Sequence, residues 1–365
     1  MNYCHDNNMV TSTQSDDVQG CTSVAGGRTP GATRDIYPWQ RPLWERLQAL
    51  RNAQRLPHAL LFQGATGLGK SHLAHVFAQS LLCTQPDSES RPCGRCRNCL
   101  LYLAGNNPDF FQILPEEGGD KPIKIDQVRE LNRVMTLKSH GGGYKIAIIS
   151  PAEHMNAAAA NSLLKTLEEP PPQTLLILIS HTPGLLLPTI RSRCQNLHFE
   201  IPPHGVALAW LSAQLSSPAN ASELLDVAHG APLTALALAA SDVLKHRLAL
   251  LADLERLLQR QADPVTVAAA WSQQPGAEIL SQLLSWTGDL IRLRHAVEPP
   301  YLANPDLAQR LNRLAAQFDL KSLYRLLDQM QGALLLSSRP LNPQLLLEDV
   351  LISWVNITGT VVASA

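Results

Sequence analysis

Charge of either sign is sparse in this sequence, and long apolar runs are absent. Asp, Glu, Lys and Arg make up 17% of the 365 residues, and 30 basic residues nearly balance 31 acidic ones, for a net charge of −1 at pH 7. No overall field therefore attracts the chain to nucleic acid. No run of about 18 apolar residues occurs, so we expect no membrane span. With 45% hydrophobic residues the chain can bury substantial cores, and its length predicts two or three domains.

The first 35 residues also lack an apolar segment. They are polar and rich in Gly, Ser, Thr and Asp, and hydrophobic patterning begins only near Ile36. A secretory signal peptide needs an apolar central region, so we exclude one. We expect residues 1–35 to be a disordered tail or the product of a start assigned too far upstream.

Cysteine is scarce and unevenly distributed. Only seven occur, an odd number, and four of them fall between residues 83 and 99. This distribution indicates a metal site in a reducing compartment, the cytoplasm, and not a disulfide framework. The candidate ligands are Cys83, Cys93, Cys96 and Cys99.

The last three of these cysteines follow a C-x₂-C-x₂-C spacing, which lets thiolates in a turn converge on one tetrahedral ion. We predict a structural four-cysteine zinc site, with Gly94 in the tight turn and Cys83 at a helix end. An iron–sulfur cluster is the main alternative, because bacterial ferredoxin motifs open with the same spacing. The Cys-Pro continuation of that motif is missing here, and nothing suggests an open ligand position.

A phosphate-binding loop is the most specific local motif. Residues 64–71 read GATGLGKS, between an apolar segment at 58–63 and a helical pattern from residue 73. Strand, loop and helix are the context that the motif G-x-x-x-x-G-K-[ST] requires. The glycines let the backbone approach phosphates, Lys70 would reach the β- and γ-phosphates, and Ser71 would ligate Mg²⁺. The alternative is a Gly-rich turn before a helix. The candidate binding residues are Gly64, Gly67, Gly69, Lys70 and Ser71.

Further apolar segments alternate with helical patterns in the first 200 residues. Residues 107–114, 145–149 and 174–179 read as strands. Helices are expected from Ile125, with Asp126 as a possible cap, and over 156–168. This alternation predicts an α/β fold, a mostly parallel sheet with helices on both faces.

Strand signals fade after about residue 202. Short helical segments follow to about residue 240, and beyond them leucines at helical spacing predict a C-terminal helix bundle. We interpret the leucine stripes as the core of this bundle, with an oligomer face as the alternative. The expected helices cover residues 244–261, 277–296, 305–317, 320–337 and 343–356.

Two motifs downstream of the loop make the sequence similar to a known family. Residues 163–171 read LLKTLEEPP, and residues 192–194 read SRC. Each motif alone is modest, but the ordered set of phosphate-binding loop, four cysteines and these two motifs resembles bacterial clamp-loader subunits of the AAA+ class over residues 36–200. The segments YPW at 37–39 and NPQLLL at 342–347 resemble one non-hydrolysing subunit type of the DNA polymerase III clamp loader.

The resemblance implies a division into domains. An AAA+ P-loop domain would cover residues 36–201 and contain a zinc module at 83–105. A small helical lid domain would follow at 202–243, and a C-terminal helical collar that mediates oligomerisation would cover 244–365. Residues 1–35 would lie outside these domains.

The resemblance also points to missing catalytic groups. In the family's ATPases the strand before the LLKTLEEPP helix ends in Asp-Glu, and here those places hold Ser150 and Pro151. Ser cannot replace a carboxylate that holds Mg²⁺, and Pro cannot orient the attacking water. Glu153 comes too late in the chain to fill either place. Leu233 stands where the family's lid domain supplies an arginine, so ATP binding is possible but hydrolysis is not expected.

Arg193, in the SRC motif, is retained although the chain's own catalytic groups are not. In the family this arginine crosses the subunit interface into a neighbour's ATP site as an arginine finger. The resemblance therefore implies that Arg193 acts in trans. The alternative is a helix-end arginine that pairs with a carboxylate.

The sequence thus indicates a non-hydrolysing clamp-loader subunit, with no ATPase or polymerase activity of its own, within the DNA polymerase III holoenzyme. The implied partners are the gamma/tau and delta subunits and, indirectly, the sliding clamp and primer-template DNA. The alternative is a catalytically active ATPase subunit like gamma/tau, which Lys70 and Ser71 favour. A zinc-dependent nucleic-acid-binding module fits less well, because the cysteine segment has few aromatic residues and only two arginines.

Overall fold

A computed structural model describes residues 34–116, 121–240, 243–296, 299–337 and 341–358. The expected N-terminal tail therefore lies outside the described residues, apart from its last two positions, and so do Cys4 and Cys21. Those two positions, Arg34 and Asp35, already contact the cysteine segment: Arg34 donates to the carbonyl oxygen of Cys93, and Asp35 pairs with Arg91 at 2.9 Å.

The first part of the chain forms a five-stranded parallel sheet in the order β2-β3-β4-β1-β5. Four of the strands lie where the apolar segments predicted them. The fifth was not predicted, because among its residues only Leu197 is buried and the sequence gives no apolar run at this edge of the sheet. The strands are β1 (Ala59–Gln63), β2 (Phe110–Ile113), β3 (Lys145–Ile149), β4 (Thr174–Ser180) and β5 (Gln195–His198).

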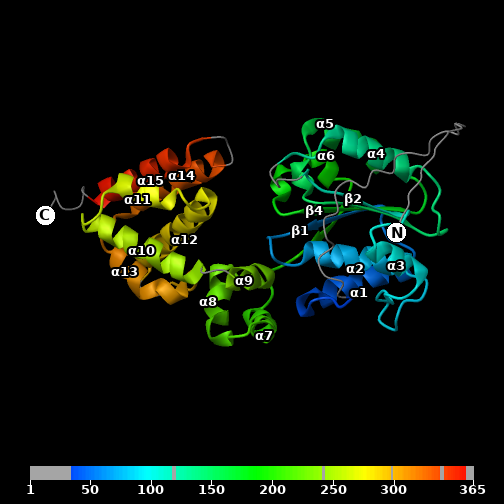
Figure 1. The fold of residues 1–365 in the computed structure, drawn as a ribbon, viewed down its shortest axis with the longest axis horizontal. Helices are drawn as coiled ribbons and strands as arrows, with labels where there is room; N and C mark the ends of the chain where they lie inside the picture. The colour runs from blue at the N-terminus through cyan, green and yellow to red at the C-terminus, as the bar shows by residue number, and fades with distance from the viewer. Residues whose placement is uncertain (1–33, 117–120, 241–242, 297–298, 338–340, 359–365) are drawn as a thin grey trace, which may run out of the picture.

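Helices cover both faces of the sheet, as the alternation predicted (Figure 1). Successive residues of a strand point to opposite faces, so Leu60 and Phe62 join the core with one helical layer while Ala59 and Leu61 join the other. One layer contains α1 (Arg41–Asn52), α2 (Lys70–Leu82) and α3 (Arg97–Leu103). The other contains α4 (Ile125–Met135), α5 (Ala157–Glu168) and α6 (Pro188–Arg191).

The start of α4 differs from the prediction. Asp126 is not the cap: the helix begins at Ile125, and the cap position is Lys124, whose backbone N–H donates to Oε1 of Gln127 at 2.9 Å. Asp126 lies in the first turn instead, where its negative charge is favourable near the helix N-terminus. Helix α5 does begin as expected, because Asn156 accepts a hydrogen bond from the backbone N–H of Ala159 at 2.8 Å.

Three short helices follow the sheet, α7 (His204–Gln214), α8 (Ala221–Val227) and α9 (Pro232–Ala239). They pack around a small core of their own that includes Leu211 and Leu225. In Figure 1 these helices lie beside the sheet part, between it and the C-terminal helices.

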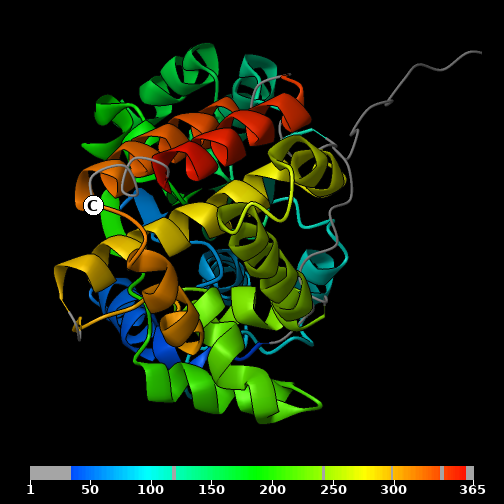
Figure 2. The ribbon, with the colours of Figure 1, turned by 90° about the vertical axis from the view of Figure 1, so that its left-hand side faces the viewer.

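The C-terminal part is the helix bundle that the leucine spacing predicted (Figure 2). Leu251, Leu254 and Leu257 are fully buried in its core, together with Trp286 and Trp354. The short helix α11 was missed, because its eight residues carry little amphipathic pattern. The bundle comprises α10 (Val243–Leu258), α11 (Pro264–Trp271), α12 (Gly276–His295), α13 (Ala308–Ala315), α14 (Leu320–Leu336) and α15 (Pro343–Thr358).

Candidate phosphate-binding loop, cysteine cluster and Arg193

The glycine-rich loop connects β1 to α2, as its motif requires. Gly64 directly follows the strand, and Gly67 and Gly69 both adopt a φ of +79°, which L side chains rarely reach. Space forbids larger residues as well. A Cβ on Gly67 would lie 2.0 Å from Oγ1 of Thr234, and one on Gly69 would lie 2.5 Å from Nε2 of Gln40. The loop is therefore packed closely against two other parts of the chain.

Lys70 begins α2 and folds back over the loop. Its ammonium donates to the carbonyl oxygens of Gly64 at 2.7 Å and Ala65 at 2.6 Å, and the residue is 3% exposed. Burial lowers the pKa of Lys70 to about 8, and the negative charge of Glu153 opposes that shift. Ser71 follows in the first turn of α2. The structure thus places the Lys70 ammonium against the loop, with Ser71 next to Lys70 at the start of α2.

Side chains and backbone from outside the loop hold its carbonyl groups. The carbonyl oxygen of Leu68 accepts from Nε1 of Trp39 at 3.1 Å and from Nε2 of Gln40 at 3.0 Å. Gln40 also donates to the carbonyl oxygen of Gly69 at 2.8 Å. On the other side, the backbone N–H of Leu233 in α9 donates to the carbonyl oxygen of Gly67 at 3.1 Å. The loop is therefore held in shape by the chain itself.

An aromatic cluster beside the loop was not found from the sequence. Tyr37 stacks on Trp39 with ring centres 4.9 Å apart, and its ring also lies 4.6 Å from that of His72 in α2. Trp210, from α7, packs edge-on against the rings of Tyr37 and Trp39, with ring centres 5.3 Å and 5.2 Å away. We call Tyr37, Trp39, His72 and Trp210 the aromatic cluster. It joins the N-terminal segment, the helix after the loop and the three-helix unit.

No carboxylate stands at the end of β3, where the resemblance places the metal and water-orienting groups of an ATPase: the residues there are Ser150 and Pro151. Glu153 follows one turn later and braces the end of β4. Its Oε1 accepts from the backbone N–H groups of His181 at 2.8 Å and Thr182 at 3.1 Å. Burial alone would raise the pKa of Glu153, but these donors keep it below its usual value. Oε1 of Glu153 is thus engaged at the end of β4, whereas its Oε2 is buried without a hydrogen-bond partner among the described residues. The negative charge of Glu153 also acts on Lys70, whose pKa it raises against the effect of burial.

The four predicted cysteines come together. Their sulfur atoms all lie within 4.8 Å of one another and can hold a metal ion. Cys83 ends α2, Cys93 lies in the following loop, and Cys96 and Cys99 lie at the start of α3. Backbone N–H groups donate to two of the sulfurs, from Cys93 to Cys83 and from Cys96 to Cys93, both at 3.3 Å.

The cysteine cluster is tied firmly to the P-loop helix. The hydroxyl of Tyr102 in α3 lies 2.6 Å from Nδ1 of His75 in α2, and both side chains are buried. Nδ2 of Asn98 donates to the carbonyl oxygen of Leu82 at 2.9 Å. Burial lowers the pKa of His75 to about 4, so the imidazole is neutral at pH 7.

Arg193 lies just after α6, a helix on the face of the sheet opposite α2 (Figure 1). Its Nη2 pairs with Oε1 of Glu168 at 2.7 Å, and its Nη1 donates to the carbonyl oxygen of Thr189 at 3.0 Å. The Arg193 side chain is 36% exposed and that of Glu168 is 51% exposed. In the structure of the single chain, Arg193 therefore pairs with a carboxylate, as in the alternative that the sequence left open. Glu168 was not singled out beforehand.

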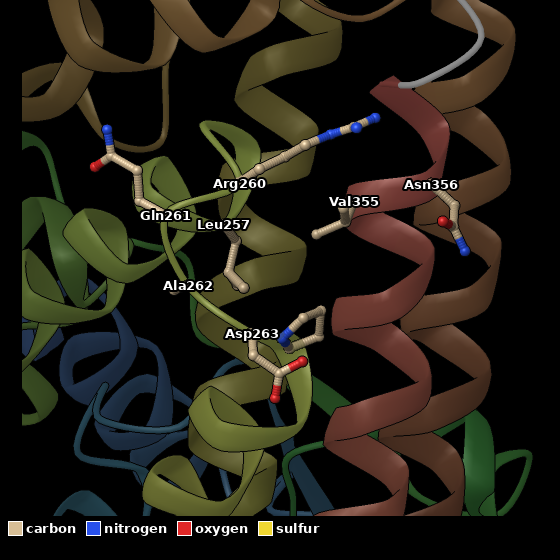
Figure 3. Close-up of a pocket in the computed structure, with 8 residues that line it drawn as sticks. Leu257, Arg260, Gln261, Ala262, Asp263, Val355 and Asn356 are labelled. Carbon is tan, nitrogen blue, oxygen red and sulfur yellow. The ribbon is translucent and has the colours of Figure 1, made fainter.

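A hollow lies in the C-terminal bundle, away from the loop, the cysteines and Arg193 (Figure 3). It measures about 580 Å³ and opens between the end of α10 and α15. Asp263 lines it, but this carboxylate caps α11 by accepting from the backbone N–H of Thr266 at 2.9 Å. Arg260 extends away from Asp263. The described residues around this hollow therefore form no catalytic constellation.

A parallel sheet with the phosphate-binding loop after β1, followed by a three-helix unit against that loop and a helix bundle, defines a P-loop protein of the AAA+ class. The family described as "DNA polymerase III, delta subunit" matches residues 39–203, and the one described as "DNA polymerase III, delta subunit, C terminal" matches residues 241–356.

Curated relatives agree over nearly the whole chain. DNA polymerase III subunit delta' of Pseudomonas aeruginosa is 37% identical over 329 residues, which cover 89% of this chain and 99% of the relative. The protein of the same description from Escherichia coli is 33% identical over 323 residues, covering 87% and 94%. The chain therefore belongs to the DNA polymerase III subunit delta' family, and the resemblance seen in its motifs is confirmed.

Among solved structures, a gamma subunit-related protein of DNA polymerase III from Thermotoga maritima aligns with 86% of this chain and 99% of its own, at 18% identity and a TM-score of 0.41.

None of the helices in the described residues combines the length and the apolar composition that crossing a membrane requires.

Proposed function

We propose that the chain serves in the DNA polymerase III clamp loader as a subunit that does not hydrolyse ATP. The observation that carries this is the end of β3, where Ser150 and Pro151 stand in place of the two carboxylates of an ATPase. Glu153 comes three residues after Ser150, and its Oε1 accepts from the backbone N–H groups after β4, so we assign it neither of the two roles. Without a metal-binding carboxylate and a group to orient water, the γ-phosphate has no activated attacker.

Arg193 is the group that this subunit offers to a partner. We assign it as an arginine finger that reaches into the ATP site of an adjacent gamma/tau subunit and stabilises the charge on the transferring phosphoryl group. Its partial exposure supports this, because the guanidinium can be reached from outside. Its contact with Glu168 is a surface ion pair, which contributes little to stability and leaves further N–H groups of the guanidinium for a docking phosphate.

The cysteine cluster is proposed to hold one structural zinc ion. Four thiolates around zinc with bonds of about 2.3 Å place their sulfurs about 3.8 Å apart. The sulfurs of Cys83 and Cys96 are 3.9 Å apart and those of Cys93 and Cys99 are 4.0 Å apart, which fits. In a four-iron cluster each thiolate binds a different iron, so the four sulfurs lie farther apart than they do around one ion. The short distances between the sulfurs here therefore favour a single ion. The ion would pin the segment 83–105 to α2.

The phosphate-binding loop is proposed to accept ATP weakly. Lys70, Ser71 and the three glycines supply phosphate contacts, whereas the missing carboxylates leave Mg²⁺ poorly held. Because the chain already holds the carbonyl groups of the loop, nucleotide is not needed to shape it.

The parts of the chain correspond to proposed domains. Residues 36–201 form the AAA+ domain with its zinc module, 202–243 the lid, and 244–365 the collar that binds neighbouring subunits. The proposed partners are the gamma/tau and delta subunits in the cytoplasm and, through them, the sliding clamp and primer-template DNA.

Reconstitution tests this function. Purified gamma/tau and delta should form a stable loader with this chain, and loading of the clamp onto primed DNA should require it. The isolated chain should show no ATP turnover. Turnover that disappears in Lys70→Ala would instead establish an active ATPase subunit, the function that the intact Lys70 and Ser71 favour.

A further inference from the structure

Arg193 is held at two points on its own chain. Nη2 pairs with Oε1 of Glu168 at 2.7 Å, and Nη1 donates to the carbonyl oxygen of Thr189 at 3.0 Å. A guanidinium carries five N–H donors in a fixed plane, so two contacts to different nitrogens set both the position and the direction of that plane. Three donors remain for a further acceptor.

The carboxylate that holds Arg193 is itself on a fixed support. Glu168 is the last residue of α5, and that helix is bound to α4 through Asn132. Nδ2 of Asn132 donates to the carbonyl oxygen of Ser162 at 2.9 Å, and its Oδ1 accepts from the hydroxyl of Thr166 at 2.8 Å. The position of Glu168 is therefore determined by packed helices, although its side chain is on the surface.

The pair contributes little to folding, because both side chains are substantially exposed and water screens their attraction. Its larger effect is on the freedom of Arg193. A long, unrestrained arginine loses rotamer entropy when it binds, and holding it beforehand in the bound orientation removes that cost. An ion pair of little value for stability is thus of value for a residue that must meet a phosphate in a defined direction.

We propose that Glu168 is a positioning residue for the arginine finger: its carboxylate fixes the Arg193 guanidinium in the orientation that it presents to the nucleotide of the neighbouring subunit. This inference rests on the proposed function of Arg193. Glu168 keeps its contact to Nη2 while the free N–H groups bind the phosphate oxygens, so the finger is already oriented when the subunits meet.

The test uses the reconstituted loader with Glu168→Ala, Glu168→Gln, Arg193→Ala and the double variant Glu168→Ala/Arg193→Ala. Glu168→Ala should lower kcat of the site that Arg193 completes by about threefold to tenfold, with the KM for ATP little changed. Glu168→Gln keeps an acceptor oxygen but no charge, so its loss should be smaller. In the Arg193→Ala background, Glu168→Ala should cause no further loss.

Glu169→Ala is the matched control, because it removes the adjacent, exposed carboxylate of the same segment and should leave kcat unchanged. An equal loss from Glu168→Ala with and without Arg193 would overturn the proposal, since Glu168 would then act independently. A higher kcat in the Glu168→Ala loader would also overturn the proposal, because Glu168 would then hold Arg193 back from the nucleotide. If Arg193→Ala alone changes nothing, the finger itself fails, which is a separate result.

Discussion

The backbone N–H of Leu233 donates to the carbonyl oxygen of Gly67 at 3.1 Å, which joins the three-helix unit directly to the phosphate-binding loop. The resemblance places an arginine of the active ATPases at the position of Leu233. The positive charge of that arginine would contact the phosphates of a bound nucleotide. Here an apolar residue holds the loop through its backbone. The three-helix unit therefore contacts the phosphate-binding loop directly, with no charged side chain at this position.

The aromatic cluster should contribute to this contact. Trp210→Ala removes the edge-on contacts with Tyr37 and Trp39, and we expect the free energy of unfolding to fall by about 1–3 kcal/mol. Amide hydrogen exchange should become faster in the loop 64–70, which the cluster covers. Tyr37→Phe keeps the ring and serves as the control, with little change expected. If the loop exchanges at the same rate in Trp210→Ala and in the unaltered protein, the aromatic cluster does not stabilise the loop.

The parts of the site that the sequence predicted are those encoded within short segments. The loop at 64–71 and the cysteines at 83–99 each carry their geometry in local spacing, so motif and structure agree. The aromatic cluster was missed because Trp210 is far along the chain from Tyr37, and nothing local says that the two rings meet. Which carboxylate pairs with Arg193 was undetermined for the same reason.

The fold shows the same distinction. Strands that are buried at every position and contain a run of apolar residues, such as β3 and β4, were predicted from those apolar runs. The edge strand β5 was not, because pairing with β1 on one side stabilises it although most of its side chains are polar. The cap of α4 was misassigned because Gln127, and not Asp126, bonds to the backbone at the helix start.

The protonation of Lys70 should control nucleotide binding. Burial lowers its pKa to about 8, against the opposing charge of Glu153. Phosphate binding requires the charged ammonium, so ATP affinity should fall as the pH rises through about 8, approaching tenfold per pH unit above it. Calorimetric titrations about one pH unit on either side of this value measure the change. Lys70→Ala should bind ATP much more weakly and lose the pH dependence. Affinity that is constant over this range would refute the role of Lys70.

The cysteine cluster should contain one zinc ion per chain after purification without chelator. Cys96→Ser should lose the ion, and the segment 83–105 should become accessible to protease, because a structural zinc contributes directly to folding. Cys194→Ser is the control: this cysteine is also buried, but it packs in the sheet core away from the other four, so zinc content should be unchanged. Elemental analysis measures the metal. Iron, or no metal in the unaltered protein, would rule out the zinc site.

Loss of Arg193 should affect a partner and not this chain. Arg193→Ala removes a surface ion pair with Glu168, which contributes about 0–1 kcal/mol, so folding and assembly with the loader should be preserved. Arg191→Ala is the matched control, because it removes an exposed positive charge two residues away, at the end of α6. Melting curves and gel filtration of both variants check these points before activity is compared.

In the reconstituted loader, Arg193→Ala should lower ATP hydrolysis only at the one site that this arginine completes. An arginine finger at such a site accelerates phosphoryl transfer by about 10³–10⁵ in other NTPases, so this site should become nearly silent. Because the other sites keep their own arginines, bulk hydrolysis should fall only in part. Clamp loading should fall further, since it needs all sites to act together. Single-turnover hydrolysis and the rate of clamp loading measure the two effects. Rates equal to those of Arg191→Ala would show that Arg193 is a structural residue and that its pairing with Glu168 is its whole role.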